Sequence, residues 1–476
     1  MKAKTLVCSI FLFFVGNIWA QSLSKILYDF RHHASMKHAL VAYHIIELGT
    51  GKTMASRNAT VMMSPASTLK TLYVFSALDD YGMDFSFRTD LYYHGHVKFD
   101  TLHGDLILRS GGDPTFGSPV TDETPNEIFN QIIQKLQRAG IRTVMGKIIL
   151  QVNGNFYPAP GSWPLEDIGN YYGAGYWGFN FADNTIYVYL KNHPVAGKQV
   201  KVDHTEPQMY KLRFLSHVYT APPGTADNAY IFADPLCYER HIFGTIPAGD
   251  SLFVIKGALP DPPRFFIHEL KNHLLQAGIT INGPARVETR IKKYPNEKLI
   301  WGKISKSLHE IGQFTLDHSV NLYSEALARL VVEKGVPAHG YMSKDSINAY
   351  FRSKGFRFID LEDGSGLAPD NMIAPVEFTR FFYRLSQKHG IAYLKDILPH
   401  AGQDGYAKSV MRGMTYQSHV WIKSGSVSKV QNYVGIFKGR SGKYYAFALM
   451  VNHFTAQRKT IQKQMHLLLN RMIRVL

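Results

Sequence analysis

Ser67 and Lys70 are the residues of this chain whose types and spacing most directly suggest chemistry. Ser64 is a suitable N-cap and Pro65 suits the first helical position, so a helix is predicted to begin here and continue through Ala77. Ser67 would lie in the first turn of that helix, and the Lys70 amine, three residues later, could reach its hydroxyl. The two would form a nucleophile and its base, provided that burial or another cation lowers the pKa of the lysine.

Ser319 and Asn321 form a second polar cluster. They open a segment, residues 322–331, whose apolar side chains recur at helical spacing. At a helix entrance, a hydroxyl and a side-chain amide could face a cleft. The alternative is an ordinary helix N-cap without chemical function.

Lys423, Ser424, Gly425 and Ser426 form the third cluster, at the end of a strand-like run. On an edge strand, the ammonium of Lys423 could be directed toward an anion, and Gly425 would let a ligand backbone approach closely. The alternative is a solvated hairpin with a polar tip.

In this order, the three clusters resemble the three signature motifs of the penicillin-binding proteins and serine β-lactamases. The long interval between Ser67 and Ser319 resembles the D-alanyl-D-alanine carboxypeptidase/endopeptidase family, the class C low-molecular-mass penicillin-binding proteins, in which extra domains are inserted there. Ser424 departs from the family in standing where Thr is commoner, but it keeps the hydroxyl. Further similar strings are residues 104–106, 111–115, 163–167, 172–174 and 363–367.

The resemblance implies a serine D-Ala-D-Ala carboxypeptidase or DD-endopeptidase that works through an acyl-enzyme. Ser67 would attack the carbonyl of the terminal D-Ala-D-Ala bond and release D-alanine, while Lys70 takes its proton. Ser319 would relay a proton toward the leaving amine, and Asn321 would orient the substrate amide and the Lys70 amine. Water would then cleave the ester.

The third cluster would bind the free carboxylate of the substrate through Lys423 and the hydroxyls of Ser424 and Ser426, beside Gly425. Backbone N–H groups of Ser67 and Ser426 would form the oxyanion hole. The partners implied are peptidoglycan stem peptides as substrates and β-lactam antibiotics as covalent inhibitors. No cofactor and no metal are expected.

Asp167 is a further candidate for substrate binding. Residues 163–167 resemble a Trp-containing segment of the family, after which an acidic residue contacts the free amine of the third residue of the stem peptide. The substrate would then carry diaminopimelate. The alternative is a carboxylate on a surface loop.

The elements that must position these residues indicate an α+β fold. Helices are expected around the first two clusters, and three strand-like runs, at 421–426, 432–437 and 444–452, predict an antiparallel meander around the third. We therefore expect a transpeptidase-like domain, an antiparallel sheet flanked by helices, from residues 21–92 and 295–476. A mostly β insertion of one or two domains, residues 93–294, would interrupt it.

Composition and charge narrow the cellular setting of the protein. The chain has 476 residues, of which 45% are hydrophobic, and this excludes a disordered chain. Its net charge of +16 favours anionic surroundings, but the basic residues form no block, so no nucleic acid partner is expected. Residues 1–20 have the pattern of a cleaved signal peptide, which predicts export to the periplasm or beyond the cytoplasmic membrane.

Three alternatives to a DD-peptidase remain open. A serine β-lactamase shares the acylation groups but needs fast deacylation, a transpeptidase would use an amine in place of water, and a wall-binding protein would bind without turnover.

The basic amphipathic stretch at residues 458–474 could lie on a membrane, so membrane association is expected to be peripheral at most. Packing of this stretch on the sheet as a terminal helix is the favoured interpretation, and the sequence does not indicate an oligomeric state.

Overall fold

The computed structural model describes residues 22–121, 123–154, 157–209, 211–334 and 342–476. The predicted signal peptide, residues 1–20, lies outside these ranges. None of the helices in the described part of the chain is both long and apolar enough to cross a membrane. The only cysteine within the described ranges, Cys237, is exposed.

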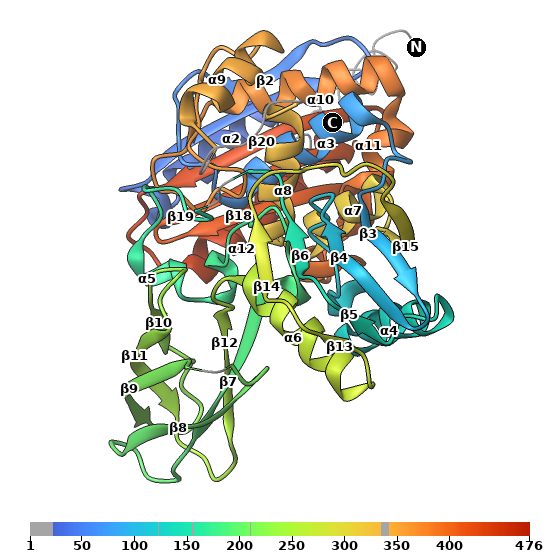
Figure 1. Cartoon of the computed structure of the whole chain (residues 1–476). Helices are drawn as coiled ribbons and strands as arrows, with labels where there is room; N and C mark the ends of the chain where they lie inside the picture. Colours follow the sequence, from blue (N-terminus) through green and yellow to red (C-terminus); the bar gives the residue numbers. More distant parts are fainter. Residues whose placement is uncertain (1–21, 122, 155–156, 210, 335–341) are drawn as a thin grey trace, which may run out of the picture. The chain divides into compact units, whose positions relative to one another are not determined.

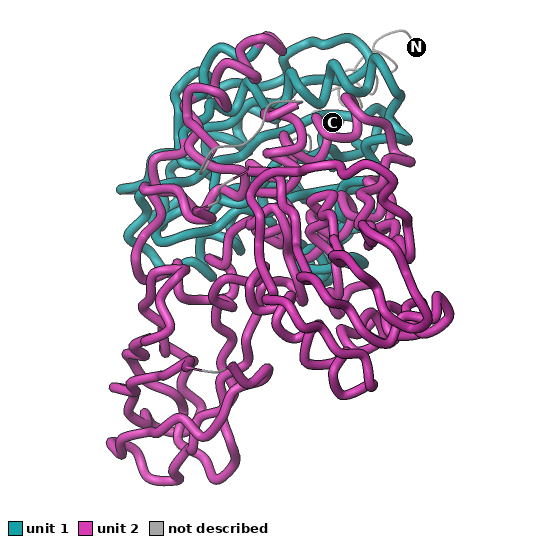
Figure 2. The backbone as a smooth tube through the Cα atoms, in the orientation of Figure 1, with its two compact units in different colours: residues 1–68, 356–359, 372–476 teal, residues 69–355, 360–371 magenta. Residues whose placement is uncertain are grey.

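The chain divides into two compact units, which Figure 2 colours teal and magenta. Unit 1 contains the described residues up to Thr68 together with 356–359 and 372–476, and unit 2 contains residues 69–355 and 360–371. The predicted insertion, residues 93–294, lies within unit 2, which also holds helices of the predicted catalytic domain. This division into compact units does not test the predicted domain boundaries, which stay a prediction.

Unit 1 is built on a five-stranded antiparallel sheet with the strand order β18-β19-β20-β1-β2 (Figure 1). Its last three strands in the sequence form the expected meander, and β18, which carries the third cluster, is an edge strand as expected. The bounds are β1 (Leu40–Glu47), β2 (Thr53–Arg57), β18 (Val420–Val427), β19 (Val430–Lys438) and β20 (Tyr444–Asn452).

Helices cover both faces of this sheet. Tyr43 and Ile45 of β1 belong to a core that includes residues of α2 and α12, whereas His44 between them contacts Thr379 of α10. Successive residues of a strand point to opposite faces, so α10 lies across the sheet from the other two helices. The helices are α2 (Leu23–His32), α10 (Pro375–His389), α11 (Ile391–Ile397) and α12 (Arg458–Val475), with short turns η1 (Ala34–Met36), η6 (Gly405–Ser409) and η7 (Gln417–His419).

The terminal helix α12 packs on the sheet, which was the favoured interpretation of its amphipathic sequence. Its apolar stripe, Ile461, Met465, Leu468 and Met472, is buried in the core of unit 1. Burial of four large apolar side chains contributes about 1.5–3 kcal/mol each before entropy costs, so this helix is an integral part of the unit.

Unit 2 contains a helical part that surrounds the first two clusters. The helix α3 packs against α7 and α8. A capping box formed by Ser307 and Glu310 starts α7, and Ser319, in a left-handed conformation with φ 54°, ends it. The helices are α3 (Lys70–Tyr81), α7 (Leu308–His318), α8 (Asn321–Val332) and α9 (Lys344–Ser353).

The predicted insertion and the strand β15 that follows it form strands and helices around a second apolar core. One sheet has the order β13-β5-β4-β3-β15, with β6 beside β4 and β14 beside β6, and α4 and α6 pack against it. These elements are β3 (Arg88–Lys98), β4 (Thr101–Arg109), α4 (Pro125–Arg138), β5 (Thr143–Val144), β6 (Ile148–Gln151), α6 (Pro262–Gln276), β13 (Thr280–Ile281), β14 (Ala285–Glu288) and β15 (Lys298–Ile304).

A six-stranded sheet, with the order β10-β11-β9-β8-β7-β12, completes unit 2 (Figure 1). Only β9 and β11 run parallel, and the other neighbours are antiparallel. The bounds are β7 (Thr185–Lys191), β8 (Gln199–Glu206), β9 (Arg213–Ala221), β10 (Tyr230–Phe232), β11 (Glu239–Pro247) and β12 (Phe253–Ala258). Short elements are η3 (Pro119–Thr121), α5 (Leu165–Ile168), η4 (Tyr171–Gly173), η5 (Ala182–Asn184), β16 (Ile359–Asp360) and β17 (Met372–Ile373).

Candidate active site

Ser67 lies in the short helix η2 (Ala66–Leu69), which continues directly into α3. The helical segment starts at Ala66, one residue later than predicted, and ends at Tyr81. The start is displaced because Ala66 adopts a left-handed φ of 48°, a conformation that costs energy for a residue with a Cβ and is often found at functional sites. Ser67 and Lys70 are therefore one turn apart on continuous helical backbone, as the sequence predicted.

Gly425 of β18 packs directly against the start of this helical segment, so unit 1 brings Ser67 and the third cluster together. A Cβ placed on Gly425 would lie 2.5 Å from the carbonyl oxygen of Pro65, 2.7 Å from the amide nitrogen of Thr68 and 3.0 Å from that of Ser67. All three are backbone atoms, so only glycine fits between the strand and the helical turn.

Two buried amides hold the residues that precede Ser67. Asn432 of β19 donates from Nδ2 to the carbonyl oxygens of Ser64 (2.8 Å) and Pro65 (3.0 Å), and Asn452 of β20 donates to that of Ser64 (3.1 Å). Both amides lie within otherwise apolar strands, where an unsatisfied polar group is costly. They fix the nucleophile segment on the sheet, a role that the sequence did not reveal.

The remaining residues of the third cluster differ in exposure. The side chain of Lys423 is buried, and its Nζ donates to the carbonyl oxygen of Ser424 at 2.9 Å. Ser424 is half-buried and Ser426 is exposed. Along β18 the hydroxyls thus become accessible toward the end of the strand that carries Gly425.

Lys70 is completely buried in unit 2. Its Nζ donates to the carbonyl oxygen of Ser365 at 2.6 Å. Burial lowers its pKa from 10.5 to about 7, although the carboxylates of Asp363 and Glu325 oppose this shift. An amine with this pKa is about half unprotonated at pH 7, so it can accept a proton from a neighbouring hydroxyl.

Asp363 organises the loop that receives the Lys70 ammonium. One carboxylate oxygen accepts from the amide of Gly366 (2.7 Å) and from Asn371 Nδ2 (2.8 Å), and the other from the amide of Ala368 (2.7 Å) and from Trp163 Nε1 (2.9 Å). Two N–H donors on each oxygen are the pattern of an ionised carboxylate. The carbonyl oxygen of Asp363 also accepts from the hydroxyl of Tyr73, in the first turns of α3.

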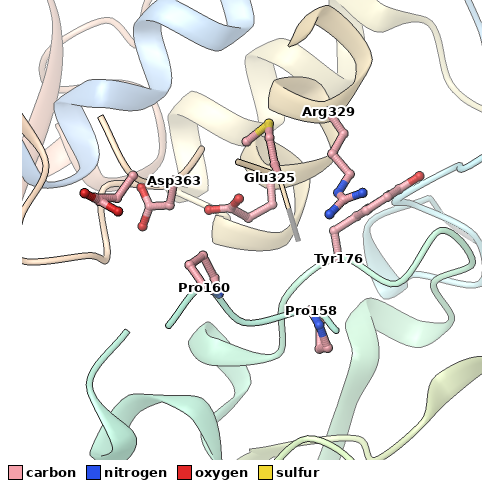
Figure 3. A pocket seen from close by; sticks show the side chains of 8 residues that line it. Pro158, Pro160, Tyr176, Glu325, Arg329 and Asp363 are labelled. Carbon is pink, nitrogen blue, oxygen red and sulfur yellow. The ribbon is translucent and has the colours of Figure 1, made fainter. Parts of the chain in front are cut away.

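Glu325, on α8, lies behind the same loop. Both its carboxylate oxygens lie within hydrogen-bond distance of the amide of Gly364, at 3.0 and 3.1 Å. Burial and the charge of Asp363 raise the pKa of Glu325 to about 8. Figure 3 shows Glu325 and Asp363 lining a small pocket opposite Tyr176 and Arg329, with a volume of about 10 Å³, enough for about one water molecule.

Asn321 and Asp167 are brought together in unit 2 through Tyr172. Asn321 Nδ2 donates to the carbonyl oxygen of Tyr172 at 2.8 Å, and the Tyr172 hydroxyl donates to the carboxylate of Asp167 at 3.1 Å. Asp167 is half-buried, and burial raises its pKa. Ser319, also half-buried, ends α7 two residues before Asn321.

The predicted site residues therefore fall into two groups, one in each unit. Ser67, Ser424, Gly425 and Ser426 belong to unit 1 with Lys423, and Lys70, Ser319, Asn321 and Asp167 belong to unit 2. The helical turn that carries Ser67 and Lys70 joins the two groups covalently. Arrangement of both around one substrate stays a prediction.

Sequence reasoning did not single out Glu325 and did not assign a role to Asp363. A carboxylate within the buried face of a predicted helix, six positions after Ser319, is the signal that could have identified Glu325. Asp363 lay in a string that resembled the family, but two of its partners, Trp163 and Tyr73, are far away in the sequence.

The fold and the site define the class of protein to which this chain belongs. A sheet flanked by helices, a serine and a lysine one helical turn apart, and a strand whose glycine packs against that turn agree with the motif set of the penicillin-binding proteins and serine β-lactamases. A family model matches residues 20–472, and the chain belongs to the D-Ala-D-Ala carboxypeptidase 3 (S13) family. Mixed helices and sheets in this arrangement confirm the predicted α+β fold class.

Several relatives extend this assignment. The chain is 23% identical to the D-alanyl-D-alanine carboxypeptidase DacB of Haemophilus influenzae over 421 residues, which cover 86% of this chain and 84% of that protein. It is 22% identical to a D-alanyl-D-alanine carboxypeptidase of an Actinomadura species, over 88% and 78% of the two chains. The crystal structure of penicillin-binding protein 4 of Haemophilus influenzae has the same fold, with a TM-score of 0.77 and 20% identity over 95% of this chain and 98% of that one.

Proposed function

We propose that this protein is a penicillin-sensitive serine DD-peptidase, which cleaves the terminal D-Ala-D-Ala bond of peptidoglycan stem peptides through an acyl-enzyme on Ser67. The observation that carries the proposal is the complete burial of Lys70 one helical turn from Ser67, with a pKa of about 7. A lysine on a solvated surface would hold its proton at neutral pH and could not serve as a base. Membership of the S13 family supports the same activity.

The proposed mechanism begins with proton transfer from Ser67 to Lys70. The Ser67 oxygen attacks the carbonyl of the penultimate D-Ala. Ser319 then donates its proton to the leaving nitrogen and takes up the proton held by Lys70, and D-alanine departs. Asn321 orients the substrate amide, in keeping with its anchored position beside Tyr172. Water then attacks the ester and restores Ser67.

Specificity for a chain terminus is assigned to the third cluster. Lys423 and the hydroxyls of Ser424 and Ser426 bind the substrate carboxylate, with a charge-assisted contact that contributes about 1.5–3 kcal/mol. Gly425 lets the substrate approach β18. Asp167 binds the amine of diaminopimelate in the stem peptide, which fits its half-buried carboxylate and its link to Asn321 through Tyr172.

The proposed setting is the periplasm or another space outside the cytoplasmic membrane. The signal-like residues 1–20 and the net charge of +16 support contact with an anionic cell envelope. β-Lactam antibiotics are proposed to acylate Ser67 because they present a reactive carbonyl beside a carboxylate. A crystal structure of penicillin-binding protein 4 of Haemophilus influenzae in complex with a β-lactam, TM-score 0.73, has the same fold.

Mass spectrometry after incubation with penicillin tests this proposal. We expect a covalent adduct on Ser67 in the wild-type protein and in a Ser353→Ala control, whose hydroxyl is exposed on α9. The adduct must be absent in Ser67→Ala. Absence of an adduct in the wild-type protein would contradict the mechanism. Rapid penicillin turnover without release of D-alanine from a stem pentapeptide would indicate a β-lactamase instead.

A further inference from the structure

The proposed mechanism gives no role to the buried carboxylate of Glu325. It is 7% exposed and lies on α8, the helix that Asn321 begins. Its oxygens meet the amide of Gly364, and the next residue of that loop, Ser365, provides the carbonyl oxygen that accepts from Lys70 Nζ at 2.6 Å. Glu325 and Lys70 therefore contact adjacent residues of one loop, from α8 and α3.

The charges around Glu325 come from each element that packs against it. Lys70 and Tyr73 face it from α3, Asp363 from the loop, and Tyr176, Glu362 and Arg329 line the pocket beside it. Asp363 already accepts four N–H hydrogen bonds. The oxygens of Asp363 are therefore occupied by donors, and Glu325 is the carboxylate of this pair that can carry a proton.

The pocket beside Glu325 offers a path for that proton. It is lined by Glu325, Asp363, Glu362, Arg329 and Tyr176, with Pro158, Pro160 and Met342 completing it, and has room for about one water molecule (Figure 3). Glu362, on the same pocket, is only partly buried and is paired with the exposed Lys344 at 2.6 Å. A water in the pocket would connect the Glu325 carboxyl with groups that reach the surface.

We propose that Glu325 is a positioning residue that tunes the base strength of Lys70, by exchanging its proton with water through this pocket. When the Ser67 O–H bond breaks, a new N–H bond forms on Lys70. In the same interval the Glu325 O–H bond breaks, and its proton passes to the pocket water and on to solvent. The resulting carboxylate stabilises the new ammonium.

The direction of the coupling follows from the charges. An ionised Glu325 raises the pKa of Lys70, and a protonated Glu325 leaves it low. Lys70 is therefore the weaker base while Glu325 is protonated and the stronger base once Glu325 has lost its proton. Because the two groups interact, their protons leave in two steps that belong to the pair.

The inference rests on the proposed function, and its test separates the two. The second-order rate constant for acylation of Ser67 by a chromogenic cephalosporin is measured between pH 5.5 and 9.5 for the full chain. The wild-type rate should rise through two ionisations, and Glu325→Gln should show one rise with a plateau about tenfold lower. Glutamine keeps the volume and the acceptor for the Gly364 amide, so a merely structural role predicts an unchanged profile.

Glu269→Gln is the control, because its carboxylate lies on α6, bonded to Asn272, and does not line the pocket beside Glu325. It should keep both ionisations. A wild-type protein that is not acylated would refute the proposed function itself. Two results would overturn only the role of Glu325: a wild-type acylation rate whose pH profile shows a single ionisation, or a Glu325→Gln profile that retains two. The wild-type profile alone decides the matter if the variant does not fold.

Discussion

Replacement of Gly425 by alanine is the perturbation whose effect can be worked most directly from the geometry. The added Cβ would lie 2.5 Å from the carbonyl oxygen of Pro65, where ordinary contacts begin at 3.4 Å, so strand and helical turn must separate by about 0.9 Å. The neighbouring atoms are all backbone, and no flexible side chain can yield instead. A displacement of about 1 Å at a reacting centre costs on the order of 100-fold in rate.

The acylation rate with a chromogenic cephalosporin and the thermal midpoint measure this effect together. We expect a fall of about 100-fold in the rate for Gly425→Ala, with a loss of about 1–3 kcal/mol in the free energy of unfolding from overpacking. Gly49→Ala is the control, because the nearest atom to its Cβ, Glu47 Oε1, lies 3.7 Å away. If Gly425→Ala folds and reacts within threefold of the wild type, the close approach of β18 does not position Ser67.

Three further substitutions, the last with a matched control, test other parts of the structure. Asp167→Ala should reduce cleavage of a diaminopimelate-containing stem peptide far more than cleavage of the same peptide without the side-chain amine; equal losses would remove Asp167 from substrate recognition. Trp163→Phe deletes the hydrogen bond to the Asp363 carboxylate and should lower the free energy of unfolding by about 1.5–3 kcal/mol, measured by urea denaturation; an unchanged midpoint would show that this bond contributes nothing. Phe266→Ala, at a fully buried position of α6, should cost about 3–5 kcal/mol, whereas Leu275→Ala, at a 60% exposed position of the same helix, should cost less than 1 kcal/mol.

The local elements that carry the three clusters could be predicted from sequence because their signals are local. The helix after Ser67, the strand that ends in Ser426 and the apolar stripe of α12 each depend on residues within about 20 positions. The start of the first helix was wrong by one residue, since the left-handed conformation of Ala66 is imposed by packing against β18 and by Asn432, which lie far along the chain.

The residues that support the clusters could not be predicted, because their partners lie far away in the sequence. Asn432 and Glu325 look in sequence like tolerated polar residues in apolar segments, and their partners, Pro65 and Gly364, become neighbours only in the folded chain. The parallel pairing of β9 with β11 likewise has no signal in either strand. A pattern identifies the reacting groups, whereas long-range contacts decide their protonation and position.

The hydrogen bond between Trp163 and Asp363 has a consequence for attempts to redesign this protein. It joins the segment that precedes Asp167 to the loop on which Lys70 rests, so the part that would choose the stem peptide and the part that would govern its turnover share one buried support. Substrate preference and catalytic speed should therefore change together when that segment is altered. A variant library aimed at new peptide selectivity would do better to keep the indole and vary only the exposed positions Leu165 and Glu166.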